Sequence, residues 1–327
     1  MKSVDALTTH AMILAMRILV TGGAGFIGSH LAEALVHGGH HVRVIDNFLS
    51  GRPENLKSVA DSVEVHRGDC ADLAAAHRAA KGMEVVFHQA AVPSVARSVE
   101  DPWQSHHANA TATLVMLLAA RDAGVRRFIY AGSSSVYGDR PGLPKREDMP
   151  TEPRSPYAVG KLTGEHYLRN FAELYGLETV TLRYFNVFGP RQDPGSPYSG
   201  VISLFITALL DGRRPVIYGD GLQTRDFTYV ENVVDGNLRA LAASAAGRGE
   251  VINIATGRRV TLRRLLGAIA REVGRPPTAR HAPSRSGDVR HSLADIRRAR
   301  RLLGYRPLYD LETGLRKTID WYREAKA

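Results

Sequence analysis

The chain has 327 residues, of which 44% are hydrophobic, so it can bury a large core as one big domain or two unequal ones. Cys70 is the single cysteine, which excludes an intramolecular disulfide and fits a reducing compartment. The formal net charge is +10, but the arginines between residues 258 and 301 stand at helical spacing among leucines and isoleucines, as on solvated helix faces. We therefore expect no nucleic-acid partner.

The sequence contains no apolar run near the roughly 18 residues that a membrane helix needs, and its N-terminal stretch lacks a signal-peptide pattern. These features predict a cytoplasmic protein that does not associate with membranes. Residues 1–15 precede the first predicted strand, and we expect them to form an extension outside the fold.

Short β-rich runs alternate with helical patterns through residue 184. The predicted strands are 17–21, 42–46, 63–66, 84–88, 127–131 and 179–184. Long helices are predicted over 102–123 and 157–175. This alternation predicts an α/β fold built on a Rossmann-type, doubly wound parallel sheet.

After Gly189-Pro190 the pattern changes to a loop rich in proline, glycine and serine, followed by shorter elements. Helices are expected near 201–211, 231–246, 261–273, 293–303 and 310–325, and strands near 215–218 and 226–230. We predict a dinucleotide-binding domain over 16–189 and a smaller C-terminal α/β substrate domain over 190–327, with the chain crossing between them. Chemistry is expected in the cleft at the carboxyl ends of the strands.

A glycine-rich turn over Thr21–Gly28 follows the first predicted strand and leads into a helical pattern. Its first glycine allows the tight turn, the second lets the backbone approach a pyrophosphate, and the third lets the helix pack against the sheet. The context predicts a dinucleotide site. The residues of the turn expected to line it are Gly22, Gly25, Phe26, Ile27 and Gly28.

The second predicted strand ends at Asp46, close to the spacing at which an acidic residue accepts hydrogen bonds from the adenosine ribose. A carboxylate at this place repels a 2′-phosphate. Asp46 therefore predicts NAD rather than NADP as the cofactor.

Three residues form a candidate acid/base group. Ser133 stands where the fifth predicted strand ends, and Tyr157 and Lys161 are spaced i, i+4, which places them on one helix face. An ammonium beside a phenol stabilises the phenolate and lowers the phenol pKa. We expect Tyr157 to act as the base, with Ser133 relaying the proton.

From Met16 to the C-terminus the chain resembles the extended short-chain dehydrogenase/reductases, and within them the UDP-sugar 4-epimerases. The matching segments are 21–30, 46–47, 68–69, 88–91, 132–138, 157–161, 183–191 and 224–227. The resemblance implies tightly bound NAD, with Asn47, Asp69, Ala90, Asn109 and Lys161 in its shell. One departure is Ala112, where the family usually has glycine.

The resemblance also assigns the substrate side. It places Asn186, Arg225 and Arg285 around a UDP diphosphate and Tyr218 near the uracil, and two arginines suit two phosphates. It implies that the sugar is lined by Ser94, Ser133, Ser134 and Ser292. The small Ser292 would leave room for an N-acetyl group at C2, although a serine before residue 293 also suits a helix cap.

The reaction implied is NAD-dependent 4-epimerisation through a transient 4-keto sugar. Ser134 and Ser135 disfavour dehydratases, which carry an Asp-Glu pair there, and UDP-glucuronate decarboxylases, which carry a Glu at the second position. A UDP-glucuronate 4-epimerase shares the serines but typically has Thr at the place of Asn186, and a sensor without turnover would not need the acid/base group. A homodimer is expected, and no metal-binding motif is present.

Overall fold

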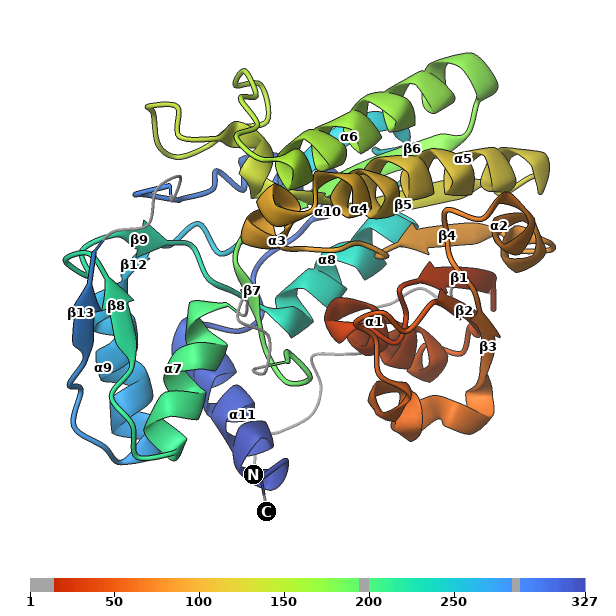
Figure 1. Ribbon diagram of the computed structural model, residues 1–327. Coiled ribbons are helices and arrows are strands. Elements are labelled where there is room, and N and C mark those ends of the chain that lie inside the picture. Colours follow the sequence, from red (N-terminus) through yellow and green to blue (C-terminus); the bar gives the residue numbers. More distant parts are fainter. Residues whose placement is uncertain (1–14, 194–199, 284–288, 327) are drawn as a thin grey trace.

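The computed structural model describes residues 15–193, 200–283 and 289–326. Its centre is a seven-stranded, all-parallel sheet in the order β11-β6-β5-β4-β1-β2-β3 (Figure 1). The strands are β1 (Arg17–Thr21), β2 (His41–Asp46), β3 (Val63–Arg67), β4 (Val85–His88), β5 (Arg127–Ser133), β6 (Glu178–Tyr184) and β11 (Arg248–Ile254). The predicted doubly wound fold is confirmed.

Helices cover both faces of the sheet because successive apolar side chains of its strands point to opposite sides. Ile18 and Val20 pack with α1 (Phe26–His37), α8 (Val230–Ala242) and α10 (Arg297–Leu303). Leu19 packs on the other face, which is covered by α2 (Leu73–Ala80), α5 (Ala112–Asp122) and α6 (Pro156–Tyr175). Figure 1 shows α5 and α6 side by side on this face.

Strand β11 was not predicted. The run Val251–Ile254 is short, and Gly247 and Gly249 precede it, so local sequence gives a weak strand signal. Pairing with β6 from Thr179 to Tyr184 supplies what the local sequence lacks. Together with α8, this segment returns from the C-terminal half of the chain to the central sheet.

The long helix predicted over 102–123 is present as one helical run from Pro102 to Asp122 with a π-helical turn inside it. After α3 (Val95–Glu100), the chain forms α4 (Pro102–His106), one π-helical turn (His107–Thr111) and then α5. Single π-turns inside helices occur frequently at functional sites. Ala112, which departs from the family pattern, follows this turn directly and is 2% exposed.

The C-terminal part contains α7 (Val201–Leu210), α9 (Leu262–Val273) and α11 (Leu311–Glu324), which share one apolar core (Figure 1, lower left). Short strands pair at its edges. They are β7 (Val187–Phe188) with β10 (Thr228–Tyr229), β8 (Val216–Tyr218) with β13 (Arg280–Ala282), and β9 (Thr224–Arg225) with β12 (Val260–Thr261).

Two expectations for this part need correction. In place of the strand predicted near 226–230 there are two short strands, β9 and β10, with Asp226 and Phe227 between them. The helix predicted over 293–303 begins at Arg297, because residues 293–295 are held in an extended path by backbone hydrogen bonds to Lys145. In the described ranges, no helix is long and apolar enough to cross a membrane.

Candidate active site

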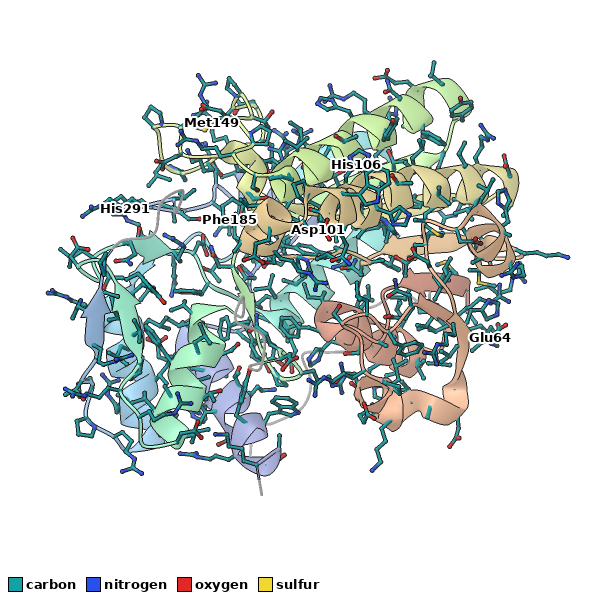
Figure 2. All side chains as sticks on the ribbon, in the orientation of Figure 1. Glu64, Asp101, His106, Met149, Phe185 and His291 are labelled. Carbon is teal, nitrogen blue, oxygen red and sulfur yellow. The ribbon has the colours of Figure 1, made fainter. Side chains whose placement is uncertain are left out.

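A cavity of about 900 Å³ opens at the carboxyl ends of the central strands and reaches the C-terminal part. Phe185 and His291, two of its lining residues, come from these two parts of the chain (Figure 2). It is lined by most of the predicted site residues, namely Gly22, Gly25, Phe26, Ile27, Gly28, Asp46, Asn47, Asp69, Ala90, Ser94, Ser133, Ser134, Tyr157, Lys161, Asn186, Arg225 and Ser292.

The glycine turn forms a cradle that side chains would fill. Gly22 has φ +63°, and a Cβ there would lie 2.7 Å from the Cα of Ala90. A Cβ on Gly28 would lie 2.1 Å from the carbonyl oxygen of Gly22, so this glycine lets α1 pack against the turn itself rather than against the sheet. Gly25 caps the N-terminus of α1, the end of a helix that attracts anions. The cradle fits the pyrophosphate of NAD.

Asp46 closes the turn from the next strand. Its carboxylate accepts hydrogen bonds from the backbone N–H of Ala24 at 2.9 Å and of Phe48 at 2.8 Å. Burial raises the pKa of Asp46, and these two hydrogen bonds oppose the rise. Nearby, the Asn47 amide donates to the Asp69 carboxylate at 3.1 Å. The acidic residues on this side suit ribose hydroxyls rather than a further phosphate.

Three predicted site residues do not line the cavity as described. Asn109 is fully buried and donates from Nδ2 to the carbonyls of Ser105 and Val92, which fixes the lining segment at Val92. Within the described residues, its Oδ1 has no hydrogen-bond partner. Tyr218 lies on β8 and is not one of the residues that line the cavity. Arg285 lies outside the described residues.

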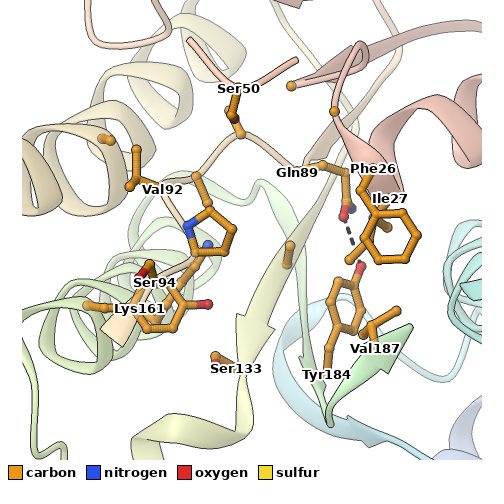
Figure 3. Close-up of a pocket in the computed structure, with 18 of the residues that line it drawn as sticks. Phe26, Ile27, Ser50, Gln89, Val92, Ser94, Ser133, Lys161, Tyr184 and Val187 are labelled. Atoms are coloured by element: carbon orange, nitrogen blue, oxygen red, sulfur yellow. Dashed lines mark hydrogen bonds between the residues drawn. The ribbon is translucent and has the colours of Figure 1, made fainter. Parts of the chain in front are cut away.

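The acid/base group assembles where β5 ends and α6 begins. Ser155 caps α6 by accepting from the N–H of Ala158, with Pro156 in the first turn, and this start orients Tyr157. Ser133 Oγ lies 2.8 Å from Ser135 Oγ. Figure 3 shows Ser133 at the end of its strand, with Lys161 and Ser94 nearby.

Burial dominates the proton affinities here. It lowers the pKa of Lys161 to about 7, with Glu165 opposing, and it raises the pKa of Tyr157, with a hydrogen bond from Ser133 opposing. The i, i+4 spacing predicted that Lys161 lowers the Tyr157 pKa. The direction is the opposite, because burial of the phenol outweighs the hydrogen bond from Ser133.

On the substrate side, Arg225 Nη1 donates to the carbonyls of Thr224 and Arg290, which anchors its guanidinium at the cavity wall. Ser292 donates its backbone N–H to Thr224. Because α10 begins five residues later, Ser292 is not a helix cap, and this alternative is wrong. Its side chain is therefore not engaged in helix capping.

The sequence reasoning missed several lining residues. The Tyr184 hydroxyl donates to Gln89 Oε1 at 3.2 Å, as Figure 3 shows, and Asn237 Nδ2 donates to the same hydroxyl. Gln89 and Tyr184 belong to segments that resemble the family, so they could have been found. Lys145 also lines the cavity, without any motif that indicates it.

The comparisons with known proteins agree with this geometry. The model of the NAD dependent epimerase/dehydratase family matches residues 18–255. A UDP-glucose 4-epimerase of Mycolicibacterium smegmatis is 44% identical over 312 residues, which cover 94% of this chain and 99% of that protein.

Solved structures give the same result. A UDP-glucose 4-epimerase of Thermotoga maritima, solved with UDP-glucose, has a TM-score of 0.91 and 39% identity, covering 95% of this chain and all of that one. A UDP-N-acetylglucosamine 4-epimerase of Methanobrevibacter ruminantium, solved with UDP-N-acetylmuramic acid, has a TM-score of 0.91 and 40% identity, with coverage of 95% and 99%. The chain belongs to the NAD-dependent epimerase/dehydratase family, as a UDP-sugar epimerase that uses NAD.

Proposed function

We propose that the chain interconverts UDP-N-acetylglucosamine and UDP-N-acetylgalactosamine by inversion at C4, and also UDP-glucose and UDP-galactose. The observation that carries this proposal is that one cavity joins the glycine cradle to Ser133, Tyr157 and Lys161. The serines at 134 and 135 favour simple epimerisation, because elimination or decarboxylation needs further acid/base groups there. Residues 16–189 supply mainly the NAD site and residues 190–327 mainly the UDP-sugar site.

In this mechanism Tyr157 takes the proton of the sugar 4-hydroxyl, directly or through Ser133, and later returns it on the other face. NAD, when bound, accepts the C4 hydride and gives it back, so that no net redox change occurs. The hydrogen bond from Ser133 opposes the burial that raises the Tyr157 pKa. We assign the Lys161 ammonium, one turn along α6, to the stabilisation of the Tyr157 phenolate. Because burial lowers the Lys161 pKa to about 7, its charged form is still well populated at neutral pH.

Inversion requires the 4-keto sugar to turn over while its nucleotide stays bound. Arg225 and Asn186 line the same cavity as Tyr157. We assign them to the diphosphate, because a guanidinium suits a phosphate group. Arg285 is assigned to the same group on the resemblance alone. A grip on the diphosphate leaves the sugar free to rotate about its tether.

The acetylated substrates are proposed because Ser292 lines the cavity with a small side chain. Plain hexoses should also react, since an enlarged pocket discriminates weakly against a smaller ligand. The comparisons include relatives of both kinds, a UDP-glucose 4-epimerase and a UDP-N-acetylglucosamine 4-epimerase.

The test is incubation of the purified protein with UDP-N-acetylgalactosamine, UDP-galactose or UDP-glucuronate, followed by chromatographic analysis of the products. Gluco-epimers of the first two are expected, with no NADH accumulating at 340 nm. UDP-galacturonate from the third substrate alone would favour the alternative function, since a UDP-glucuronate 4-epimerase of Thermodesulfobacterium geofontis is 31% identical to this chain. No turnover of any substrate would favour the sensor.

A further inference from the structure

The Lys161 ammonium lies over the face of a buried aromatic ring. Its Nζ is 4.9 Å from the ring centroid of Tyr130. Lys161 is 2% exposed, and Tyr130 is fully buried. An aromatic face attracts a cation most strongly when water is excluded, as it is here.

The Tyr130 ring is held from the sheet and from α6. Its neighbour across β4 and β5 is His88, whose ring stacks on it with centroids 5.8 Å apart and an interplanar angle of 17°. His88 is in turn fixed between the hydroxyls of Thr21 at 2.8 Å and Thr113 at 3.1 Å. On the α6 side, a Cβ on Gly164 would lie 2.5 Å from the Tyr130 hydroxyl oxygen, so glycine is required for this close approach.

The charged groups around Lys161 leave much of its lost hydration uncompensated. Glu165 follows one turn later on α6, but its carboxylate is engaged by Arg183 at 3.0 and 2.7 Å, and the side chains of this pair are each 4% exposed. His88, on β4, is neutral at physiological pH because burial lowers its pKa to about 3. Burial raises the pKa of Tyr157, on the same helix, so the phenolate that accepts the substrate proton is the minor form of this side chain in the resting site.

We propose that Tyr130 is a positioning residue of the reaction, whose ring face holds the Lys161 ammonium in its charged form in the cavity wall, with His88 keeping the ring in place. The proposal rests on the roles given above to Tyr157 and Lys161. It adds a residue that touches neither substrate nor cofactor and acts through Lys161.

The sharpest test replaces Tyr130 with phenylalanine and then with mono-, di- and trifluorinated phenylalanines, which weaken the ring face step by step with little change of shape. Two readouts follow Lys161 in the NAD-bound protein. One is the pH profile of kcat with UDP-galactose. The other is ¹³C NMR titration of the lysine side chains, of which the chain has seven, with Lys161 assigned by Lys161→Arg.

Plain phenylalanine removes the 3.4 Å contact of the Tyr130 hydroxyl with the Lys161 backbone carbonyl but keeps the ring face, so both readouts should stay close to those of the unsubstituted protein. This variant is the reference for the fluorinated series. Successive fluorines should move the Lys161 titration and the alkaline limb of the kcat profile to lower pH, by about one unit in total. The proposal would be overturned if neither the alkaline limb of the kcat profile nor the Lys161 titration moved across the fluorinated series.

A matched control separates this role from packing. Phe128 lies two residues earlier on the same strand, is equally buried and also contacts His88, with centroids 5.6 Å apart. Tyr130→Leu should shift the Lys161 titration, whereas Phe128→Leu should only destabilise the fold. Equal shifts in both variants would show that Tyr130 acts merely by packing, and if Tyr130→Leu does not fold, the fluorine series alone decides.

The two proposals fail in distinguishable ways. If the Lys161 titration follows fluorination while Tyr157→Phe remains fully active, the contact is real and the assigned chemistry is wrong. If Tyr157→Phe is inactive and the titration ignores fluorination, the chemistry stands and the role of Tyr130 is wrong.

Discussion

At the scale of single residues, Tyr157 carries the proposed chemistry. Tyr157→Phe should keep the fold and bound NAD but lower kcat by a factor of about a hundred or more, because a positioned acid/base group contributes this much. Tyr167→Phe is a matched control, since it removes a hydroxyl from the same helix away from the cavity lining. Similar kcat values for the two variants would refute the assignment.

Burial of Lys161 lowers the free energy of unfolding, although this residue is part of the proposed acid/base group. Its pKa is about 7 in the folded protein and about 10.4 when unfolded, so between these values the unfolded chain binds more protons and the folded state gains stability as pH rises. Lys161→Met removes this dependence. It should abolish turnover of the NAD-bound protein. In NAD-free protein it should raise the free energy of unfolding at pH 7 by about 2 kcal/mol or more, with the difference shrinking toward pH 10.

Urea unfolding at pH 7 and at pH 10 measures this difference. A constant difference across the range, or a less stable variant at pH 7, would contradict the burial argument.

Ser292 is expected to decide which sugars fit. Ser292→Tyr should lower turnover of the acetylated pair by a factor of roughly ten to more than a hundred, since overpacking a filled site costs about 1–3 kcal/mol. The plain pair should remain nearly unaffected. Steady-state kinetics with all four substrates checks this, and equal losses on both pairs would place the acetyl group elsewhere.

At the scale of elements, glycines in two helices should respond in opposite ways. Gly28→Ala puts a Cβ 2.1 Å from the Gly22 carbonyl, where only backbone could move, and should abolish NAD binding. Gly267, inside α9, has open space around its Cβ position, so Gly267→Ala should stabilise the protein by about 0.5–1 kcal/mol. Titration calorimetry with NAD tests Gly28→Ala, and thermal unfolding tests Gly267→Ala. Unchanged NAD affinity in Gly28→Ala would contradict the role of the glycine cradle in NAD binding.

At the scale of the whole molecule, the face formed by α3, α4 and α6 carries exposed apolar side chains. Val99, Trp103 and Val159 are 64%, 77% and 48% exposed. We propose that this face forms the homodimer contact, since clustered exposed apolar residues mark association sites. Trp103→Glu with Val99→Glu should give a monomer in sedimentation velocity, whereas the exposed Leu308→Glu should not; an unchanged oligomer would exclude this face.

Much of the fold and site could be predicted from the sequence because their determinants are local. The glycine turn, the acid after β2 and the i, i+4 spacing of Tyr157 and Lys161 are set by a few neighbouring residues. Six of the seven sheet strands were expected for the same reason, since their apolar runs are bounded by clear breaks.

Only the tertiary structure decided what depends on residues far apart in the chain. Strand β11 exists because β6 offers it a partner, and residues 293–295 stay extended because Lys145 binds them. Burial reverses the expected direction of the Tyr157 pKa, because desolvation depends on everything packed around a group. The ring of Tyr130 contacts Lys161 only because β5 and α6 pack together, so no local sequence pattern predicts this contact.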